Sequence, residues 1–303
     1  MALDPRLAAA LAVVNAEPPL LGTAAERRAE LQRRREERGP LLAPGAAPDL
    51  LSVTDHYVGN VLVRIYRPAD GPLPGLIHIH GGGWWLGSVD EDDLGCRRRA
   101  AYANVVVLSV EYRLAPENPY PAGLDDCWAA TQWAFDNAGS LGLTDIVISG
   151  GSAGGNLAAA CALRARDAGG PKLAGMLLEF PGMDLSWESE SFELYGDGYL
   201  FTKESLRECA EWYASELADP FVSPARADLA GLPPALVTTA EYDPVRDGGE
   251  LFARRMAEAG GDVTLHRVDG VVHGCGEMDL VPDLSAAYRT LVLAFLDRVL
   301  GRG

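Results

Sequence analysis

A serine framed by glycines directly follows a short apolar run in this chain. Residues 145–149 are rich in Ile and Val, and residues 150–154 then read Gly-Gly-Ser-Ala-Gly around Ser152. β-Branched residues favour a strand, and the Ala- and Leu-rich residues 156–163 favour a helix. A serine on a tight strand-to-helix turn has its hydroxyl exposed for nucleophilic attack. The alternative is a purely structural Gly-Ser turn.

A second glycine run offers bare backbone amides. His80 is followed by Gly81, Gly82 and Gly83, and residues without a side chain allow a close approach to a substrate oxygen. Together with the amide of Ala153, the amides of Gly82 and Gly83 are predicted to form an oxyanion hole. A phosphate-binding loop is the rival interpretation, but the Gly-Lys-Ser/Thr ending and the G-x-G-x-x-G spacing are both missing from this run. The two loops together predict acyl transfer through a serine.

A serine nucleophile needs a general base. The candidates are five histidines: His56, His78, His80, His266 and His273. His273 follows the strand-like residues 263–268, and catalytic side chains of open α/β sheets lie at the carboxyl ends of strands. We therefore predict that His273 is the base; the alternative is a structural loop histidine.

The base in turn needs an acid to orient it. Asp243 follows the strand-like residues 235–240 and should reach the same edge of the sheet. We expect Asp247 to be structural and Asp269 to belong to a turn. An ionised Asp243 would fix the imidazole tautomer and stabilise the imidazolium. The order serine, aspartate, histidine along the chain is that of the α/β-hydrolases.

The elements that must position these residues alternate along the chain. Strands are expected at residues 51–58, 61–66, 76–79, 105–110, 145–149, 173–179, 235–240 and 263–268, and helices at 7–14, 24–38, 122–138, 154–168 and 286–300. This alternation predicts a mostly parallel sheet with helices on both faces. Residues 183–222 interrupt it with many aromatic residues, which predicts a lid over an apolar site or, alternatively, a surface insertion.

Composition narrows the function classes. The 303 residues carry a net charge of −17, which argues against nucleic acid and anionic membrane surfaces as partners. The five cysteines show no C-x-x-C spacing, so we expect reduced thiols in a cytoplasmic protein. Cys275 lies near His273 but in no elbow-like context, which disfavours a catalytic thiol. No apolar run approaches the length of a membrane span.

Five blocks of the sequence resemble the hormone-sensitive-lipase-like (bacterial family IV) carboxylesterases. They are residues 80–84 (HGGGW), 112–117 (YRLAPE), 150–155 (GGSAGG), 232–247 (LPPALVTTAEYDPVRD) and 273–274 (HG). The resemblance implies an α/β-hydrolase fold with an eight-stranded, mostly parallel sheet and a helical cap, here residues 1–49 and 183–222. It also implies that His80 supports the glycine loop, that no cofactor or metal is needed, and that a homodimer forms through an edge strand.

The implied activity is serine carboxylesterase: hydrolysis of short- to medium-chain acyl esters, small molecules, through an acyl-enzyme. The alternatives are a deacetylase or lactone hydrolase and, from another class, a non-catalytic small-molecule-binding protein. Trp84, Trp85, Trp187 and Tyr195 are candidate walls of the substrate pocket; aromatic core packing is the alternative. The family usually has aspartate where Gly151 stands, a departure that bears on substrate preference.

Overall fold

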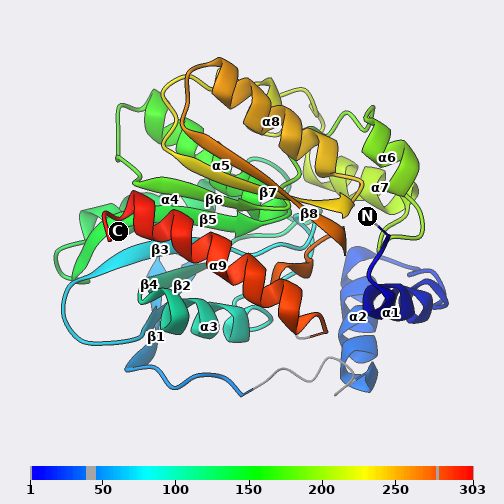
Figure 1. Ribbon diagram of the computed structural model, residues 1–303, viewed down its shortest axis with the longest axis horizontal. Helices are drawn as coiled ribbons and strands as arrows, with labels where there is room; N and C mark the ends of the chain where they lie inside the picture. The colour runs from blue at the N-terminus through cyan, green and yellow to red at the C-terminus, as the bar shows by residue number, and fades with distance from the viewer. Residues whose placement is uncertain (1, 39–45, 278–279, 303) are drawn as a thin grey trace.

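A computed structural model of the protein describes residues 2–38, 46–277 and 280–302 (Figure 1). The described residues include one eight-stranded sheet of order β1-β2-β4-β3-β5-β6-β7-β8. Its strands are β1 Ser52–Val58, β2 Val61–Arg67, β3 Leu73–Ile79, β4 Val106–Glu111, β5 Leu143–Gly151, β6 Gly175–Glu179, β7 Ala235–Tyr242 and β8 Val263–Val272. β2 runs antiparallel to both of its neighbours, and every other pair is parallel. The predicted mostly parallel sheet is confirmed.

Helices cover both faces of this sheet, as predicted. They are α1 Pro5–Asn15, α2 Ala24–Arg38, α3 Asp93–Ala103, α4 Ala122–Asp136, α5 Ala153–Asp167, α6 Glu190–Tyr195, α7 Lys203–Tyr213, α8 Arg246–Glu258 and α9 Pro282–Val299. Figure 1 shows α4, α5 and α8 on one face and α3 and α9 on the other. Among the described residues, no helix combines the length and the apolar character that crossing a bilayer requires.

Each face of the sheet has its own hydrophobic core. Ile148 of β5 packs into the core under α4, α5 and α8, whereas its neighbour Val147 packs into the core under α3 and α9. Successive side chains of a strand point to opposite faces. A central strand covered on both faces therefore becomes an uninterrupted apolar run. For this reason β4 and β5 can be predicted from the sequence.

Charged residues conceal other elements. α3 and α8 have no counterpart among the predicted helices, because α3 contains the run Arg97–Arg99 and α8 is rich in charged side chains. Asp269 lies within β8 and not in a turn, so that prediction was wrong. β8 is an edge strand with mostly exposed residues up to Asp269, so its polar side chains obscure the fact that it continues to Val272.

The N-terminal helices contact the aromatic segment 183–222 near the carboxyl ends of the parallel strands (Figure 1). Arg27 of α2 forms an ion pair with Glu208 of α7 (2.5 Å). The guanidinium of Arg27 also lies 5.2 Å from the ring centroid of Trp212. The side-chain amide of Asn15 donates to the carbonyl of Gly198 (2.8 Å). Residues 1 and 39–45 of the predicted cap lie outside the described residues.

Candidate active site

Ser152 occupies a tight turn between β5 and α5. Its backbone angles are φ 56° and ψ −118°, in a region that residues with a side chain rarely adopt. Two flanking glycines make the turn sterically feasible. A Cβ on Gly154 would lie 2.0 Å from the carbonyl oxygen of Ile79, and one on Gly150 would lie 2.3 Å from the carbonyl carbon of Gly154. The glycine spacing in the sequence is therefore a packing requirement of the turn.

The structure joins Ser152, His273 and Asp243 in one chain of hydrogen bonds. Nε2 of His273 lies 2.8 Å from the Oγ of Ser152, and its Nδ1 lies 2.7 Å from Oδ2 of Asp243. His273 follows β8 directly and Asp243 follows β7, so neighbouring parallel strands deliver both side chains to one edge. Nδ1 carries the proton toward the carboxylate, which leaves Nε2 as the acceptor for the serine hydroxyl.

Asp243 is fully buried, so its carboxylate depends on protein donors. Its Oδ1 accepts a hydrogen bond from the backbone amide of Val245 (3.0 Å), and its Oδ2 faces the imidazole. A buried carboxylate with both oxygens engaged is held in one orientation. The imidazole of His273 is held with it.

Two phenylalanines that the sequence analysis did not single out for the site flank the imidazole. The rings of Phe180 and Phe201 meet His273 edge-on, with centroids 6.2 and 5.1 Å away. Phe180 directly follows β6, so its place after a strand was the signal that could have identified it. Cys275 is buried, and burial raises the pKa of its thiol to about 12. A thiol that stays protonated is a poor nucleophile.

The glycine loop lies against the turn that carries the serine. A Cβ on Gly81 would lie 3.5 Å from the Cβ of Ser152. Gly82 and Gly83 have φ values of 120° and 59°, and a Cβ on Gly82 would lie 2.2 Å from the carbonyl oxygen of Leu86. The loop can therefore adopt this path only with glycines.

Three backbone amides remain available beside the serine. Within the described residues, the amides of Gly82, Gly83 and Ala153 donate no hydrogen bond to a protein acceptor. His80 stacks on Tyr112 (centroids 4.3 Å apart), and its Nδ1 lies 2.8 Å from the carbonyl oxygen of Gly81. Burial lowers the pKa of His80, which favours the neutral ring. His80 is thus packed into the base of the loop.

Two of the predicted pocket residues, Trp84 and Trp85, extend from this loop. Trp84 stacks on Tyr213 of α7 (4.6 Å) and Trp85 meets Trp212 edge-on (5.1 Å). Both tryptophans are buried. A Cβ on Gly182 would lie 3.7 Å from the Trp84 ring. These contacts couple the glycine loop to the aromatic segment.

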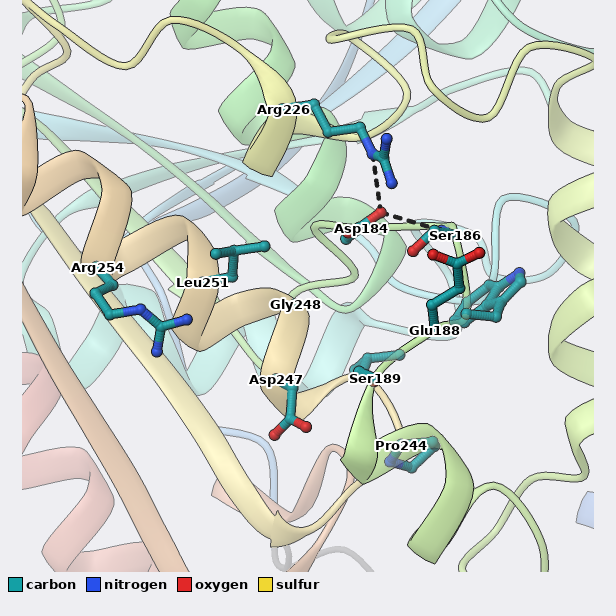
Figure 2. A pocket seen from close by; sticks show the side chains of 12 residues that line it. Asp184, Ser186, Glu188, Ser189, Arg226, Pro244, Asp247, Gly248, Leu251 and Arg254 are labelled. Atoms are coloured by element: carbon teal, nitrogen blue, oxygen red, sulfur yellow. Dashed lines mark hydrogen bonds and ion pairs between the residues drawn. The ribbon is translucent and has the colours of Figure 1, made fainter.

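The other two, Trp187 and Tyr195, lie within the aromatic segment itself. Trp187 packs against Phe192 (5.3 Å), and Tyr195 packs against Tyr199 and Tyr242 (5.3 and 5.4 Å). Trp187 also lines a surface pocket of about 300 Å³ near the loop after Asp243. Figure 2 shows charged side chains around this pocket, including Arg226 bonded to Asp184 and, on α8, Asp247 and Arg254.

Comparisons with known proteins agree with this architecture. The profile of the family described as "alpha/beta hydrolase fold" matches residues 76–277. The chain is 40% identical over 252 residues to carboxylesterase NlhH of Mycobacterium tuberculosis, covering 80% of this chain and 79% of the relative. It is 36% identical over 293 residues to an ethyl acetate hydrolase of Pseudomonas putida, covering 90% and 92%.

A solved structure extends the similarity to the whole fold. The hyperthermophilic esterase of the archaeon Pyrobaculum calidifontis superposes with a TM-score of 0.91 at 34% identity, over 99% of each chain. The fold and site define an α/β-hydrolase. The chain belongs to the hormone-sensitive-lipase-like family of carboxylesterases within that fold.

Proposed function

We propose that this protein is a serine carboxylesterase that hydrolyses short- to medium-chain acyl esters through an acyl-enzyme intermediate. The hydrogen-bonded chain from Asp243 through His273 to Ser152 carries the proposal. The relatives named as a carboxylesterase and an ethyl acetate hydrolase support it. The three available amides beside the serine supply what a developing oxyanion requires.

Acylation begins when the Oγ of Ser152 attacks the ester carbonyl carbon while Nε2 of His273 takes the hydroxyl proton. The carbonyl oxygen becomes an oxyanion that accepts hydrogen bonds from the amides of Gly82, Gly83 and Ala153. Each such donor typically contributes about 3 kcal/mol to transition-state stabilisation. The imidazolium then protonates the departing alkoxide, and the acyl group remains on the serine.

Deacylation repeats these steps with water. Nε2 of His273 takes a proton from a water molecule, the resulting hydroxide attacks the acyl-enzyme carbonyl, and the imidazolium returns the proton to the Oγ of Ser152 as the acid leaves. The buried carboxylate of Asp243 stabilises the imidazolium in both halves of the reaction.

We further propose that the described parts of residues 1–49 and 183–222 form a cap that limits the acyl chain. Trp84 and Trp85 would wall the site where the glycine loop meets α7, and Trp187 and Tyr195 would contribute from the cap. The stack of Trp84 on Tyr213 and the edge contact of Phe201 with His273 support this proposal. Rings fixed beside the acyl group would leave little room for a long chain.

The test compares wild-type protein with Ser152→Ala on p-nitrophenyl acetate, butyrate, octanoate and palmitate. Wild type should hydrolyse the short esters best, and the variant should lose activity while its circular dichroism and thermal midpoint persist. The exposed Ser140→Ala is the matched control and should retain full activity. A fluorophosphonate probe should label Ser152 in wild type. Undiminished turnover in Ser152→Ala would overturn the mechanism, and a preference for palmitate would overturn the proposed chain length.

A further inference from the structure

A second cluster of reactive side chains lies beside the glycine loop and takes no part in the proposed ester hydrolysis. His78 comes from β3, Asp92 immediately precedes α3, and Cys96 lies in the first turns of α3. Nε2 of His78 lies 2.7 Å from Oδ2 of Asp92, and Sγ of Cys96 lies 4.0 Å from the same oxygen. The three potential ligand atoms all lie within 4.8 Å of one another.

The hydrogen bonds around His78 determine which ring nitrogen carries a proton. The hydroxyl of Ser149 donates to the carbonyl of Ile77 (3.1 Å), so it accepts from Nδ1 of His78 (3.0 Å). In the neutral ring, Nε2 then presents a lone pair to the carboxylate of Asp92. A separation of 2.7 Å is that of a hydrogen bond, so a proton lies between the two atoms, and a cation would have to displace that proton as the side chains move apart. A histidine whose other nitrogen donates to a fixed oxygen is the usual form of a metal ligand.

A buried hydroxyl beside Cys96 lacks a hydrogen-bond partner. Ser109 is the register partner of His78 on β4, and its Oγ has no partner among the described residues. A thiolate coordinated to a cation would offer this hydroxyl an acceptor.

The cluster opens onto a chamber of about 270 Å³ whose walls include Gly81, Gly151 and the ion pair of Arg99 with Glu179. His78 and Cys96 are almost fully buried, whereas 34% of the Asp92 side chain is accessible. Gly151 leaves the chamber open: a Cβ there would meet only the carbonyl oxygen of Glu179, at 3.9 Å. An ion therefore has an entry path, and a water molecule has room beside it.

We propose that His78, Asp92 and Cys96 bind one divalent cation of the zinc class, with water from the chamber as the fourth ligand. Imidazole, carboxylate and thiolate together suit zinc and disfavour calcium and magnesium, which prefer oxygen alone. Carboxylate and thiolate neutralise the two positive charges. On binding, the thiol proton and the proton between His78 and Asp92 pass to solvent. The ion lies outside the Ser152–His273–Asp243 chain and is no reagent of the proposed ester hydrolysis.

The test titrates the metal-free, full-length protein with Zn²⁺ in competition with a chromogenic chelator. Wild type should bind one equivalent, and Cys96→Ser and Asp92→Asn should each bind on the order of 10- to 100-fold more weakly. Cys127→Ser is the matched control: Cys127 is likewise a buried helical cysteine but lies outside the cluster, so this variant should bind as wild type does. Calorimetry in buffers of different ionisation enthalpy should report release of about two protons per ion.

A second measurement identifies the sulfur ligand directly. Co²⁺ should produce a thiolate-to-metal charge-transfer band in wild type and in Cys127→Ser, and no such band in Cys96→Ser. Circular dichroism establishes that each variant folds. Each of the two ligand variants tests one proposed ligand, and the wild-type titration tests the site without any substitution. The proposal is overturned if wild type binds no stoichiometric Zn²⁺. It is also overturned if both ligand variants bind as tightly as wild type, the result expected for adventitious binding at an exposed histidine such as His266.

Discussion

Oδ2 of Asp243 lies 2.7 Å from Nδ1 of His273, and no part of the aspartate is exposed to solvent. We predict that Asp243→Asn lowers kcat on p-nitrophenyl butyrate by a factor on the order of 10⁴. The amide can present its NH₂ group to Nδ1, which would then accept a hydrogen bond and leave the proton on Nε2, where the base is needed. Steady-state kinetics measure the effect.

Asp247 is the matched control for that substitution. It also lies near the carboxyl end of β7. However, its Oδ2 accepts a hydrogen bond from the backbone amide of Ser191 (2.7 Å), and its Oδ1 accepts one from Nε of Arg246 (2.9 Å). Asp247→Asn should therefore lower the thermal midpoint and leave kcat within a few-fold of wild type. Equal losses of kcat in the two variants would contradict the assigned role of Asp243.

A second prediction concerns the glycine loop. A Cβ on Gly82 would lie 2.2 Å from the carbonyl oxygen of Leu86 at a φ of 120°, so Gly82→Ala must displace the loop. Because the loop amides act on the oxyanion, kcat should fall on the order of 10²- to 10³-fold with KM little changed. The measurement is the separate determination of kcat and KM.

Gly59→Ala is the control for Gly82→Ala, because it distinguishes the effect of backbone strain from the effect of displacing the loop amides. Gly59 also has a positive φ, 61°, but a Cβ there would meet nothing within 4 Å, and it lies in the turn between β1 and β2. This variant should lose some stability and keep its kcat. If Gly82→Ala retained wild-type kcat, the oxyanion role of the loop would be refuted.

The sequence was sufficient to predict that Ser152, Asp243 and His273 lie together, because the position of each depends on a local pattern. A glycine-framed serine after an apolar strand and polar residues at the ends of strands are visible within a few positions. Their assembly followed from a general property of parallel sheets, whose strand ends share one edge.

The residues around the site could not be predicted from the sequence, because their positions depend on contacts between segments that are distant in the chain. Phe201 reaches His273 from a segment 72 positions earlier in the chain, and His78 of β3 lies near Cys96 only because α3 folds back onto the sheet, against β4 and β2. α3 itself was missed because its arginines obscure the apolar periodicity, although Arg99 is buried in an ion pair with Glu179. Sequence periodicity does not predict which polar groups pair when they are distant in the chain.

That buried ion pair gives a third prediction. The carboxylate of Glu179 accepts hydrogen bonds from both terminal nitrogens of Arg99 (2.6 and 3.0 Å) and from the hydroxyl of Tyr288 (2.7 Å). Glu179→Gln removes the buried negative charge that faces a guanidinium, and such a loss typically costs about 3–5 kcal/mol in the free energy of unfolding. Urea denaturation measures it.

An exposed ion pair provides the comparison for this prediction. Arg298 and Asp262 lie 2.5 Å apart, with 45% and 54% of their side chains exposed. Asp262→Asn should change the free energy of unfolding by less than about 1 kcal/mol, because solvent screens exposed charges. Similar effects of the two substitutions would show that burial does not govern the Glu179 pair.

The fourth prediction concerns acid stability, through Arg6 at the start of α1. Arg6 bonds to Asp4 (2.8 Å) and to Asp283 (2.6 Å). Its hydrogen bonds lower the pKa of Asp4 from 3.8 to about 2 and also lower the pKa of Asp283. A carboxyl group whose pKa is lower in the folded state stabilises the fold at pH values above its unfolded pKa, and this contribution is lost as the pH falls toward the folded pKa. Arg6→Gln should therefore have a lower thermal midpoint than wild type at pH 7.

The difference between the two thermal midpoints should narrow as the pH falls from about 5 to about 3, because wild type loses the contribution of both carboxylates over that range while the variant has little to lose. Differential scanning calorimetry at several pH values measures it. Arg298→Gln is the control: it removes an exposed arginine that pairs with Asp262 and leaves Asp4 and Asp283 bonded to Arg6. Only the loss of Arg6 should therefore remove the acid-sensitive stability that depends on Asp4 and Asp283. A midpoint difference for Arg6→Gln that stays constant from pH 7 to pH 3 would show that the arginine acts through packing and not through the two carboxylates.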